Sequence, residues 1–331
     1  MKHQSDTPIS RRRVVIATAA TALSTTFPQQ GWAANKKITA AIGLDSYYAT
    51  YVVAKELGLW EKAGIDFNFR QFDDGSLGWD AIATGNADLA SATLYSLLQR
   101  VDKGVKLYPV AAIAASGTLF SIVARSEIKK PEDLIGKTVA FPIGGIAHFL
   151  FNQYAAKRNL PLDKIKQKNV PAPESIAAIS RGDVDAFLLW EPWPTRAMNL
   201  VPGTHKLANL GDDGINVINW LAVGPSLIGD QKSLVSILKV LNDASNYIQN
   251  NKKEAIQITS KTLRLPQADV SHQIENINYS MDFSKDRVMS DYNALIDFAL
   301  QVGRIKSRPN AAEIIHPEFI KLVDPKLATG W

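Results

Sequence analysis

The sequence of 331 residues contains no cysteine. A disulfide-stabilised scaffold, a thiolate metal site and a cysteine nucleophile are therefore excluded. Common catalytic signatures are also missing: there is no Gly-x-Ser-x-Gly elbow, no Walker loop, no Gly-x-Gly-x-x-Gly after a strand and no His-Glu-x-x-His. The histidines are scattered and build no local metal motif; they are His3, His148, His205, His272 and His316. We therefore expect no metal, no cofactor and no enzymatic activity.

The sequence also lacks a clustered basic face and, beyond its N-terminus, a long apolar run. The formal net charge is +5, but removal of residues 1–33 would take away four basic residues and one acidic residue. The remaining chain is nearly neutral, which disfavours a nucleic-acid binder. After residue 33 no segment reaches the roughly 18 uninterrupted apolar residues of a membrane helix, so we expect a soluble product.

The first residues carry the three parts of an export signal. Three arginines, Arg11 to Arg13, precede an apolar stretch from Val14 to Phe27 and small residues at Gly31 and Ala33. We expect residues 1–33 to be cleaved after Ala33, which would place the mature protein in the periplasm. The Ser-Arg-Arg opening and the low hydrophobicity resemble a twin-arginine signal, and an ordinary secretory signal is the alternative.

Repeated patterns indicate the fold class in a chain with 46% hydrophobic and 21% charged residues, which is an ordinary globular composition. The segments "AIATGNADLASAT" from Ala81 and "AISRGDVDAFLLW" from Ala178 each predict a helix stopped by a glycine and followed by an apolar strand. A second pair, "KITAAIGLDSYYATYVVAKELG" and "KTVAFPIGGIAHFLFNQYAAKR", predicts strand, turn and helix twice. Each half therefore reads as an α/β lobe with a mixed, mostly parallel sheet flanked by helices.

Two further patterns refine this organisation. "IDFNFRQF", from Ile65 to Phe72, alternates apolar and polar residues, as an edge or half-covered strand does. From about Gln231 onward, apolar residues recur at three-and-four spacing, which predicts a largely helical C-terminal third.

The stretch "DVDAFLLWEPWP", Asp183 to Pro194, begins as a buried strand and ends in two tryptophans, a glutamate and two prolines. Proline cannot donate to a sheet ladder, so the strand must end there. In open parallel sheets, ligands bind at the carboxyl ends of the strands, where helix N-termini expose N–H groups. We therefore expect two facing lobes to form a cleft lined by residues 45–48, 91–93, 144–148 and 190–193.

Eleven residues are candidates for ligand binding: Ser46, Tyr47, Tyr48, Ser91, Thr93, Gly144, Gly145, His148, Trp190, Glu191 and Trp220. The glycine pair could let a backbone turn approach an anion, or could serve only a tight turn. The helix after this turn carries the histidine, which would face the cleft if the turn does. Trp190 and the nearby Trp193 could equally fill the core, and Glu191 could accept a hydrogen bond from a ligand or from a backbone N–H.

The three tyrosines at the start of the first predicted helix do not share one environment. Tyr47 and Tyr51 lie on one helix face and Tyr48 points elsewhere, so we expect at least one of them in the core. Asn219 and Trp220 belong to the apolar segment "INWLAVG", near which the chain should cross back to the first lobe.

With these residues assembled, the sequence resembles the exported solute-binding proteins of ABC importers for sulfonates, taurine, nitrate and thiamine-precursor pyrimidines. The marks are "YVVAKELGLWEKAGIDFNF", "GNADLASAT", "IKKPEDLIGKTVAFPIGGIAHFLF" and "GDVDAFLLWEPWP", in the family's order. The resemblance implies a two-lobed periplasmic binding protein of the type II-like fold. Lobe I would comprise residues 34–118 plus 225–331 and lobe II residues 119–224, with crossovers near Ser116 to Ser121 and near Ala222 to Ser226.

The resemblance also implies a function. The protein would be a monomeric substrate-binding component that captures a small organic anion, sulfonate-like or related, and delivers it to an ABC permease in the inner membrane. The turn "GGIAHF" departs from the sulfonate binders, in which hydroxyl residues are common at this place. Backbone N–H groups and His148 would then remain there, while Ser91 and Thr93 supply hydroxyls from the first lobe. The aromatic residues favour a larger or flatter ligand than nitrate.

Two other functions are compatible with the same scaffold. A ligand-sensing module would use the same clamp, and nothing in the sequence separates it from a transport protein. Thiamine-pyrimidine-synthesis and desulfinase-like enzymes resemble the chain in fold, but both depend on cysteine. The lack of cysteine and the predicted export disfavour an enzyme.

Overall fold

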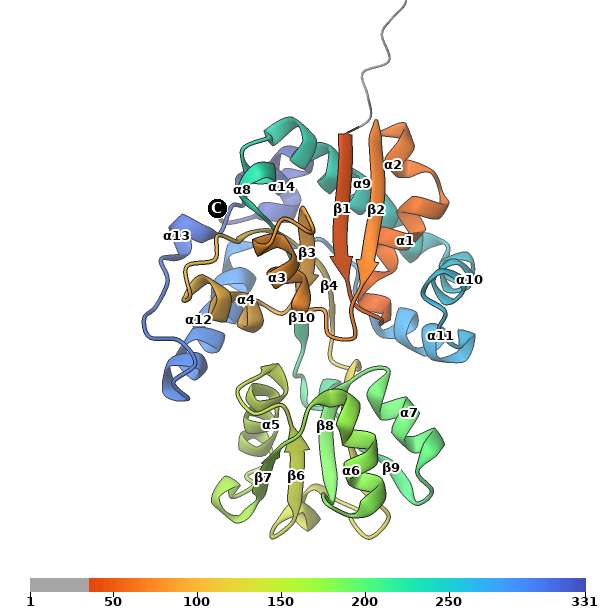
Figure 1. The fold of residues 1–331 in the computed structure, drawn as a ribbon, viewed down its shortest axis with the longest axis vertical. Coiled ribbons are helices and arrows are strands. Elements are labelled where there is room, and N and C mark those ends of the chain that lie inside the picture. The colour runs from red at the N-terminus through yellow and green to blue at the C-terminus, as the bar shows by residue number, and fades with distance from the viewer. Residues whose placement is uncertain (1–35) are drawn as a thin grey trace, which may run out of the picture. The chain divides into compact units, whose positions relative to one another are not determined.

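The structure is a computed structural model that describes residues 36–331. The predicted export signal and its cleavage after Ala33 lie outside the described residues. Within the described part the strands form two five-stranded sheets, which are drawn in the upper and lower parts of Figure 1. The first sheet has the order β2 (Ile65–Gln71), β1 (Lys36–Ile42), β3 (Leu89–Ala92), β10 (Val217–Val223), β4 (Tyr108–Ser116).

The second sheet repeats this plan. Its order is β7 (Lys166–Asn169), β6 (Thr138–Phe141), β8 (Ala186–Trp190), β5 (Phe120–Arg125), β9 (Thr204–Asn209). In each sheet the first three strands are parallel, and the last two are antiparallel to their neighbours. The predicted fold class, two mixed sheets flanked by helices, is confirmed.

The chain passes between the sheets twice. The first connection joins Ser116 at the end of β4 to Phe120 at the start of β5, as predicted. The second lies between Asn209 and Val217, and not near Ala222 to Ser226. The apolar segment "INWLAVG" was therefore assigned to the wrong side of the connection, because a fully buried strand carries no pattern that says which sheet it enters.

Helices cover both sheets, and their bounds follow the predicted pattern of strand and helix. Along the first half they are α1 (Ala49–Glu56), α2 (Leu59–Lys62), α3 (Leu77–Ala83), α4 (Leu94–Val101), α5 (Ile146–Lys157), α6 (Ser175–Arg181) and α7 (Trp193–Leu200). The C-terminal third is helical as predicted, with α8 (Pro225–Ile228), α9 (Gln231–Asn250), α10 (Lys252–Leu263), α11 (Gln267–Asn276), α12 (Lys285–Gln301), α13 (Ala311–Ile314) and α14 (Glu318–Val323). Short 3₁₀ turns include Ser46–Tyr48 before α1 and Leu210–Asp213 in the second connection.

Strand alternation places the cores. On edge strand β2, Ile65 and Phe67 are buried while Asp66 and Asn68 are exposed, which confirms the predicted edge strand. In the second sheet, neighbouring residues of β8 point to opposite faces. Leu188 therefore joins the large core, whereas its neighbours on β8 join a smaller core under α6 and α7. None of the helices between residues 36 and 331 combines the length and the apolarity needed to cross a bilayer.

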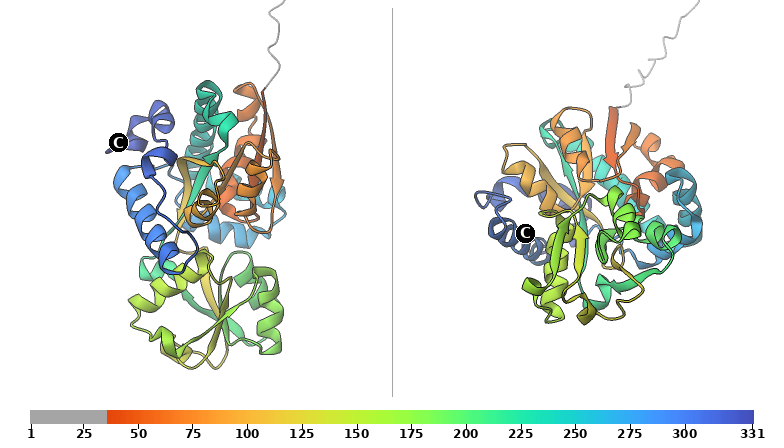
Figure 2. Two further views of the ribbon diagram at one scale, coloured as in Figure 1. Left: turned by 60° about the vertical axis from the view of Figure 1, so that its left-hand side comes forward. Right: turned by 60° about the horizontal axis from the view of Figure 1, so that its bottom comes forward.

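The C-terminal helices also touch the second-sheet half. In Figure 2 the blue helix α12 lies beside the first sheet and its end approaches the green half. Phe298 near this end contacts the rings of His148 and Phe149 on α5, with centroids 5.2 Å apart in both pairs. The two halves therefore meet directly along α12 and α5 as well as through the two connections.

Candidate ligand-binding cleft

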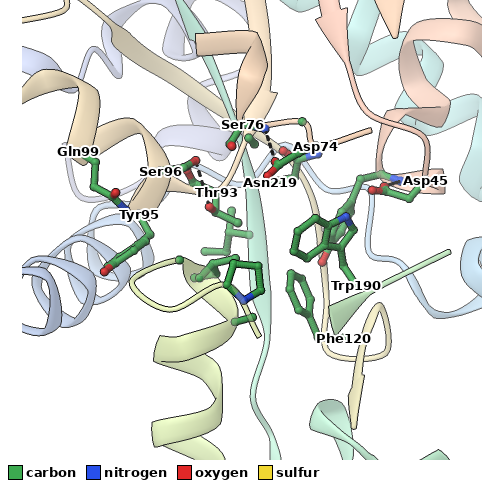
Figure 3. A pocket seen from close by; sticks show the side chains of 18 of the residues that line it. Asp45, Asp74, Ser76, Thr93, Tyr95, Ser96, Gln99, Phe120, Trp190 and Asn219 are labelled. Carbon is green, nitrogen blue, oxygen red and sulfur yellow. Dashed lines mark hydrogen bonds between the residues drawn. The ribbon is translucent and has the colours of Figure 1, made fainter. Parts of the chain in front are cut away.

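A cavity of about 160 Å³ lies at the carboxyl ends of the strands and is lined from both sheets. Its lining includes Thr93 and Pro142, which directly follow β3 and β6, and Trp190, the last residue of β8. Asp45 lies shortly after the end of β1 and lines the cavity too. A water molecule needs roughly 10–15 Å³ by a comparable measure, so the space admits a small organic molecule. Figure 3 shows Tyr95 and Gln99 on one side of the cavity and Asp45, Trp190 and Phe120 on the other.

Six of the eleven predicted site residues line this cavity: Tyr47, Tyr48, Thr93, Gly144, Gly145 and Trp190. They come from both halves, and each of the four predicted stretches contributes to the lining. In the last stretch only Trp190 does so, and residues 191–193 lie outside the lining. The cavity thus brings these residues together where the strand-end argument placed them. Their part in binding a ligand stays a prediction.

Tyr47 and Tyr48 line the cavity, and their hydroxyls donate hydrogen bonds to backbone carbonyls. The hydroxyl of Tyr48 donates to the carbonyl of Ser91 at 2.8 Å. The hydroxyl of Tyr47 lies 3.1 Å from the carbonyl oxygen of Ser116 and 2.9 Å from that of Val217. These two carbonyls stand at the two connections between the sheets, so one cavity residue is bonded directly to both.

Two helix N-termini open into the cavity. Thr93 is the N-cap of α4 and Gly145 the N-cap of α5, and residues of both first turns line the space. The first N–H groups of a helix have no partner within it, and the helix dipole adds partial positive charge there. Because α4 belongs to the first-sheet half and α5 to the second, an anion between them would contact both halves.

The turn before α5 is held by the first-sheet half. Gly144 has φ +78°, a conformation that favours glycine. The guanidinium of Arg304 lies against this glycine and donates to the carbonyl of Ile143 at 2.8 Å. Gln99 donates to the carbonyl of Gly144 at 3.3 Å. A cation and an amide therefore approach the α5 N-terminus from the opposite half.

Three predicted residues lie away from the cavity lining because their backbones or side chains are used internally. Ser46 donates its N–H to Gln273 at 3.0 Å and is fully buried. Ser91 points to the opposite strand face from Ala92 and bonds the hydroxyl of Tyr51. The indole of Trp220 is buried in the core and donates to Asp291 at 2.9 Å.

The last two predicted residues stand just behind the lining. Nδ1 of His148 accepts the N–H of Gly144 at 3.2 Å, so the ring supports the turn; burial lowers its pKa. The carboxylate of Glu191 accepts the N–H of Thr195 at 3.3 Å in the first turn of α7. Of the two hydrogen-bonding partners considered for this glutamate, the structure shows the backbone N–H. Burial raises the pKa of Glu191.

The cavity also contains residues that were not singled out. Phe120 lies directly opposite Trp190 in the β5–β8 pair, with ring centroids 6.1 Å apart. Asn219 is only 2% exposed, and neither atom of its side-chain amide has a hydrogen-bond partner among the described residues. It lines the cavity together with Ile218, while its neighbour Trp220 is buried in the core. The pairing of β10 with β4 is irregular between Asn219 and Trp220. The sequence analysis pointed to the pair Asn219 and Trp220 but did not predict which of the two side chains faces the cavity.

Asp45 is the other residue that was not singled out. Its Oδ1 accepts the N–H of Tyr47 at 2.8 Å as the N-cap of the turn before α1. The carboxyl is 8% exposed, and burial, with a smaller contribution from nearby Glu191, raises its pKa to about 7. The signal in the sequence was an N-cap aspartate shortly after a buried strand. Within residues 36–331, no group of three or more histidine or acidic side chains is placed to hold a metal ion.

Comparison with known proteins identifies the family. The sequence model of the NMT1/THI5-like family matches residues 45–255. The chain belongs to the NMT1/THI5-like family. A Brucella abortus (strain 2308) protein named "Putative binding protein" is 24% identical over 235 residues, which cover 70% of this chain and 73% of the relative. The taurine-binding periplasmic protein of Escherichia coli (strain K12) is 26% identical over 132 residues, or 40% of this chain and 41% of that protein.

Solved structures support the same fold for this family member. The alkanesulfonate-binding protein SsuA from Xanthomonas axonopodis pv. citri, bound to MOPS, superposes with a TM-score of 0.71 at 20% identity. The match covers 85% of this chain and 98% of that protein. At this identity the likeness shows the fold alone, a periplasmic binding protein fold, and the names of these relatives are those of binding proteins rather than enzymes.

Proposed function

We propose that the protein is the substrate-binding component of an ABC importer, which captures a small organic anion in the cleft between its halves. The observation that carries this proposal is the meeting of two helix N-termini, those of α4 and α5, at one cavity lined from both halves. Unpaired N–H groups at a helix start suit an anion, and Arg100 of α4 also lines the cavity. Membership in the family and relatives named for taurine and alkanesulfonate binding support the same ligand class.

The two halves act in this proposal as lobes that close on the ligand. Lobe I would comprise the first sheet with α1 to α4 and α8 to α14, and lobe II β5 to β9 with α5 to α7, with the second boundary moved to the segment before Val217. A ligand that contacts both lobes stabilises the closed form, because only that form offers both sets of contacts. The closed form would dock on an inner-membrane permease, and a monomer suffices for this.

The first test is direct binding. Protein beginning at residue 34 would be titrated calorimetrically with C2 to C6 alkanesulfonates and, as a matched control, with the corresponding primary alcohols. We expect saturable binding of a sulfonate and none of its alcohol, since the proposed contacts are made to the negative charge. Binding of alcohol and sulfonate alike would contradict capture through the helix N-termini.

Transport and export need separate tests. Uptake of the bound sulfonate by cells with and without the protein would test delivery, and unchanged uptake after deletion would contradict it. N-terminal sequencing of the periplasmic fraction tests export, with a mature start at Ala34 as the expected result. Retention of Arg11 to Arg13 in the mature protein would contradict the proposed cleaved signal.

A further inference from the structure

Two sides of the cavity carry different kinds of link between the halves. On one side the lining includes Phe120, where the first connection enters β5. On the other side it includes Tyr95 and Gln99 of α4, and Gln99 donates to the carbonyl of Gly144 in the other half at 3.3 Å. The first connection and this direct contact therefore lie on opposite sides of the cavity (Figure 3).

Phe298, near the end of α12, is the centre of the direct contacts between the halves. It is 6% exposed, and its ring centroid lies 5.8 Å from that of Tyr95 in its own half. The centroids of His148 and Phe149, on α5 of the other half, are each 5.2 Å away. Separation of the halves would break these two ring pairs and expose apolar surface to water, and both changes are unfavourable. The ring of Phe298 therefore favours the form in which the halves touch.

A polar contact joins the halves shortly after α12. The guanidinium of Arg304 donates to the carbonyl of Ile143 at 2.8 Å, in the turn before α5. Within residues 36–331 no carboxylate forms an ion pair with this arginine, whereas the neighbouring Arg308 pairs with Asp297 of its own half. Arg304 therefore holds the turn whose helix presents its first N–H groups to the cavity.

These contacts are made by the protein alone. Neither Phe298 nor Arg304 belongs to the cavity lining. Phe298 contacts Tyr95 and Arg304 lies against Gly144, so both act on the side of the cavity away from the first connection. When two bodies turn about a connection, the contacts farthest from it separate most. Such contacts must break before the cleft opens, while a ligand that enters the open form meets none of them, so they affect release more than entry.

We propose that Phe298 and Arg304 form a latch that closes the cleft behind the bound anion and sets the rate at which the anion is released. The proposal rests on the proposed capture of an organic anion and adds the element that controls its residence time. Phe298 supplies the apolar part of the latch and Arg304 the polar part. Both act through the other half and not through the ligand, so they are positioning residues. A weaker latch leaves the ligand contacts unchanged and shortens the time for which they last.

The test separates association from release. Protein beginning at residue 34 is mixed with excess 1-butanesulfonate in a stopped-flow instrument, and tryptophan fluorescence, to which Trp190 of the lining contributes, is followed. The observed rate is plotted against ligand concentration, so that the slope gives the association rate constant and the intercept the release rate constant. The solution contains about 0.3 M NaCl, which screens the longer-range attraction between Arg304 and the anion.

Two variants are each paired with a control. Phe298→Leu is compared with Phe319→Leu on α14, the same change at a residue of similar exposure, 7%, outside the cavity lining. Arg304→Gln is compared with Arg308→Gln, whose ion pair lies within one half. We expect release about tenfold faster in Phe298→Leu and about threefold faster in Arg304→Gln, because two ring pairs and one hydrogen bond are weakened. Association should change by less than about twofold, and both controls should release the anion like the wild type.

The outcomes distinguish the latch from the capture of the anion. Wild-type release in both Phe298→Leu and Arg304→Gln overturns the latch. Equal acceleration in Phe319→Leu overturns it too, since release would then follow general destabilisation, and so does slower association with unchanged release. Urea unfolding verifies that Phe298→Leu is folded; if it is not, Arg304→Gln against Arg308→Gln decides. Failure of the wild type to bind any C2 to C6 alkanesulfonate overturns the anion capture on which the latch depends.

Discussion

At the scale of single residues, Asp45 links the cavity to the stability of the protein. Its pKa rises from 3.8 to about 7 on folding. Between these two values the folded state holds a proton that the unfolded state has lost, so the free energy of unfolding falls as pH rises from about 4 to 7. Above pH 7 this contribution is constant. At neutral pH the buried carboxyl of Asp45 therefore lowers the free energy of unfolding.

We predict that Asp45→Asn flattens this pH dependence. Asparagine can still accept the N–H of Tyr47, but it does not titrate. The shift corresponds to at most about 4 kcal/mol, so the variant should gain up to that amount relative to the wild type between pH 4 and pH 8. Urea unfolding of both proteins at these two pH values measures the difference, with exposed Asp73→Asn as the control. Equal slopes for Asp45→Asn and wild type would show that the carboxyl does not titrate in this range.

The two tryptophans predicted at the site lie in different environments: Trp190 lines the cavity and Trp220 is buried in the core. Trp220 donates to Asp291, whose pKa burial raises to about 7. We predict that Trp220→Phe lowers the free energy of unfolding by about 1–3 kcal/mol, because a buried acceptor loses its donor. Trp190→Ala, at a partly exposed ring, should weaken sulfonate binding tenfold or more with a smaller loss of stability. A larger binding defect in Trp220→Phe would reverse this assignment.

At the scale of elements, the glycine turn before α5 has a left-handed backbone conformation and also contacts Arg304 of the other half. Gly144 and Gly85 both have positive φ, at +78° and +71°. A Cβ on Gly85 would meet open space, whereas one on Gly144 would lie 1.8 Å from Nε of Arg304. We predict that Gly85→Ala and Gly144→Ala cost a similar amount of stability, about 1–2 kcal/mol, since the arginine side chain can swing aside. Only Gly144→Ala should also change sulfonate affinity, which calorimetry measures.

The same elements show what a sequence can and cannot predict. Strand ends, helix starts and the internal repeat placed Thr93, Gly145 and Trp190 at one cavity. Asn219 lines the cavity and Trp220 lies in the core, and the sequence does not show this difference because every residue of β10 is buried. Phe120 entered the site through its register with Trp190, which depends on a pairing between segments far apart in the chain. Local patterns therefore predict where a site is, and tertiary pairing decides which side chains complete it.

At the scale of the whole molecule, the two connections between the sheets are packed against each other. The N–H of Gly211 donates to the carbonyl of Gly117 at 2.9 Å. A Cβ on Gly117 would lie 2.4 Å from Cα of Gly211 and 2.5 Å from the carbonyl oxygen of Ile215. Tyr47 bonds the carbonyls on either side of this contact, at Ser116 and Val217. We therefore expect a relative movement of the halves to change the backbone around this pair of glycines, next to the carbonyls that Tyr47 bonds.

We predict that Gly117→Ala impairs ligand capture although no residue of the cavity lining changes. The atoms that the new methyl group meets belong to the backbone and cannot turn away, so the connections must separate and the cost should be about 1–3 kcal/mol. Sulfonate affinity should fall. The ligand should also reduce the radius of gyration, measured by small-angle X-ray scattering, by less than it does in the wild type. Gly229→Ala, whose Cβ would make only an ordinary contact at 3.6 Å, is the matched control. Wild-type affinity and wild-type compaction in Gly117→Ala would mean that closure does not depend on the packing of the two connections.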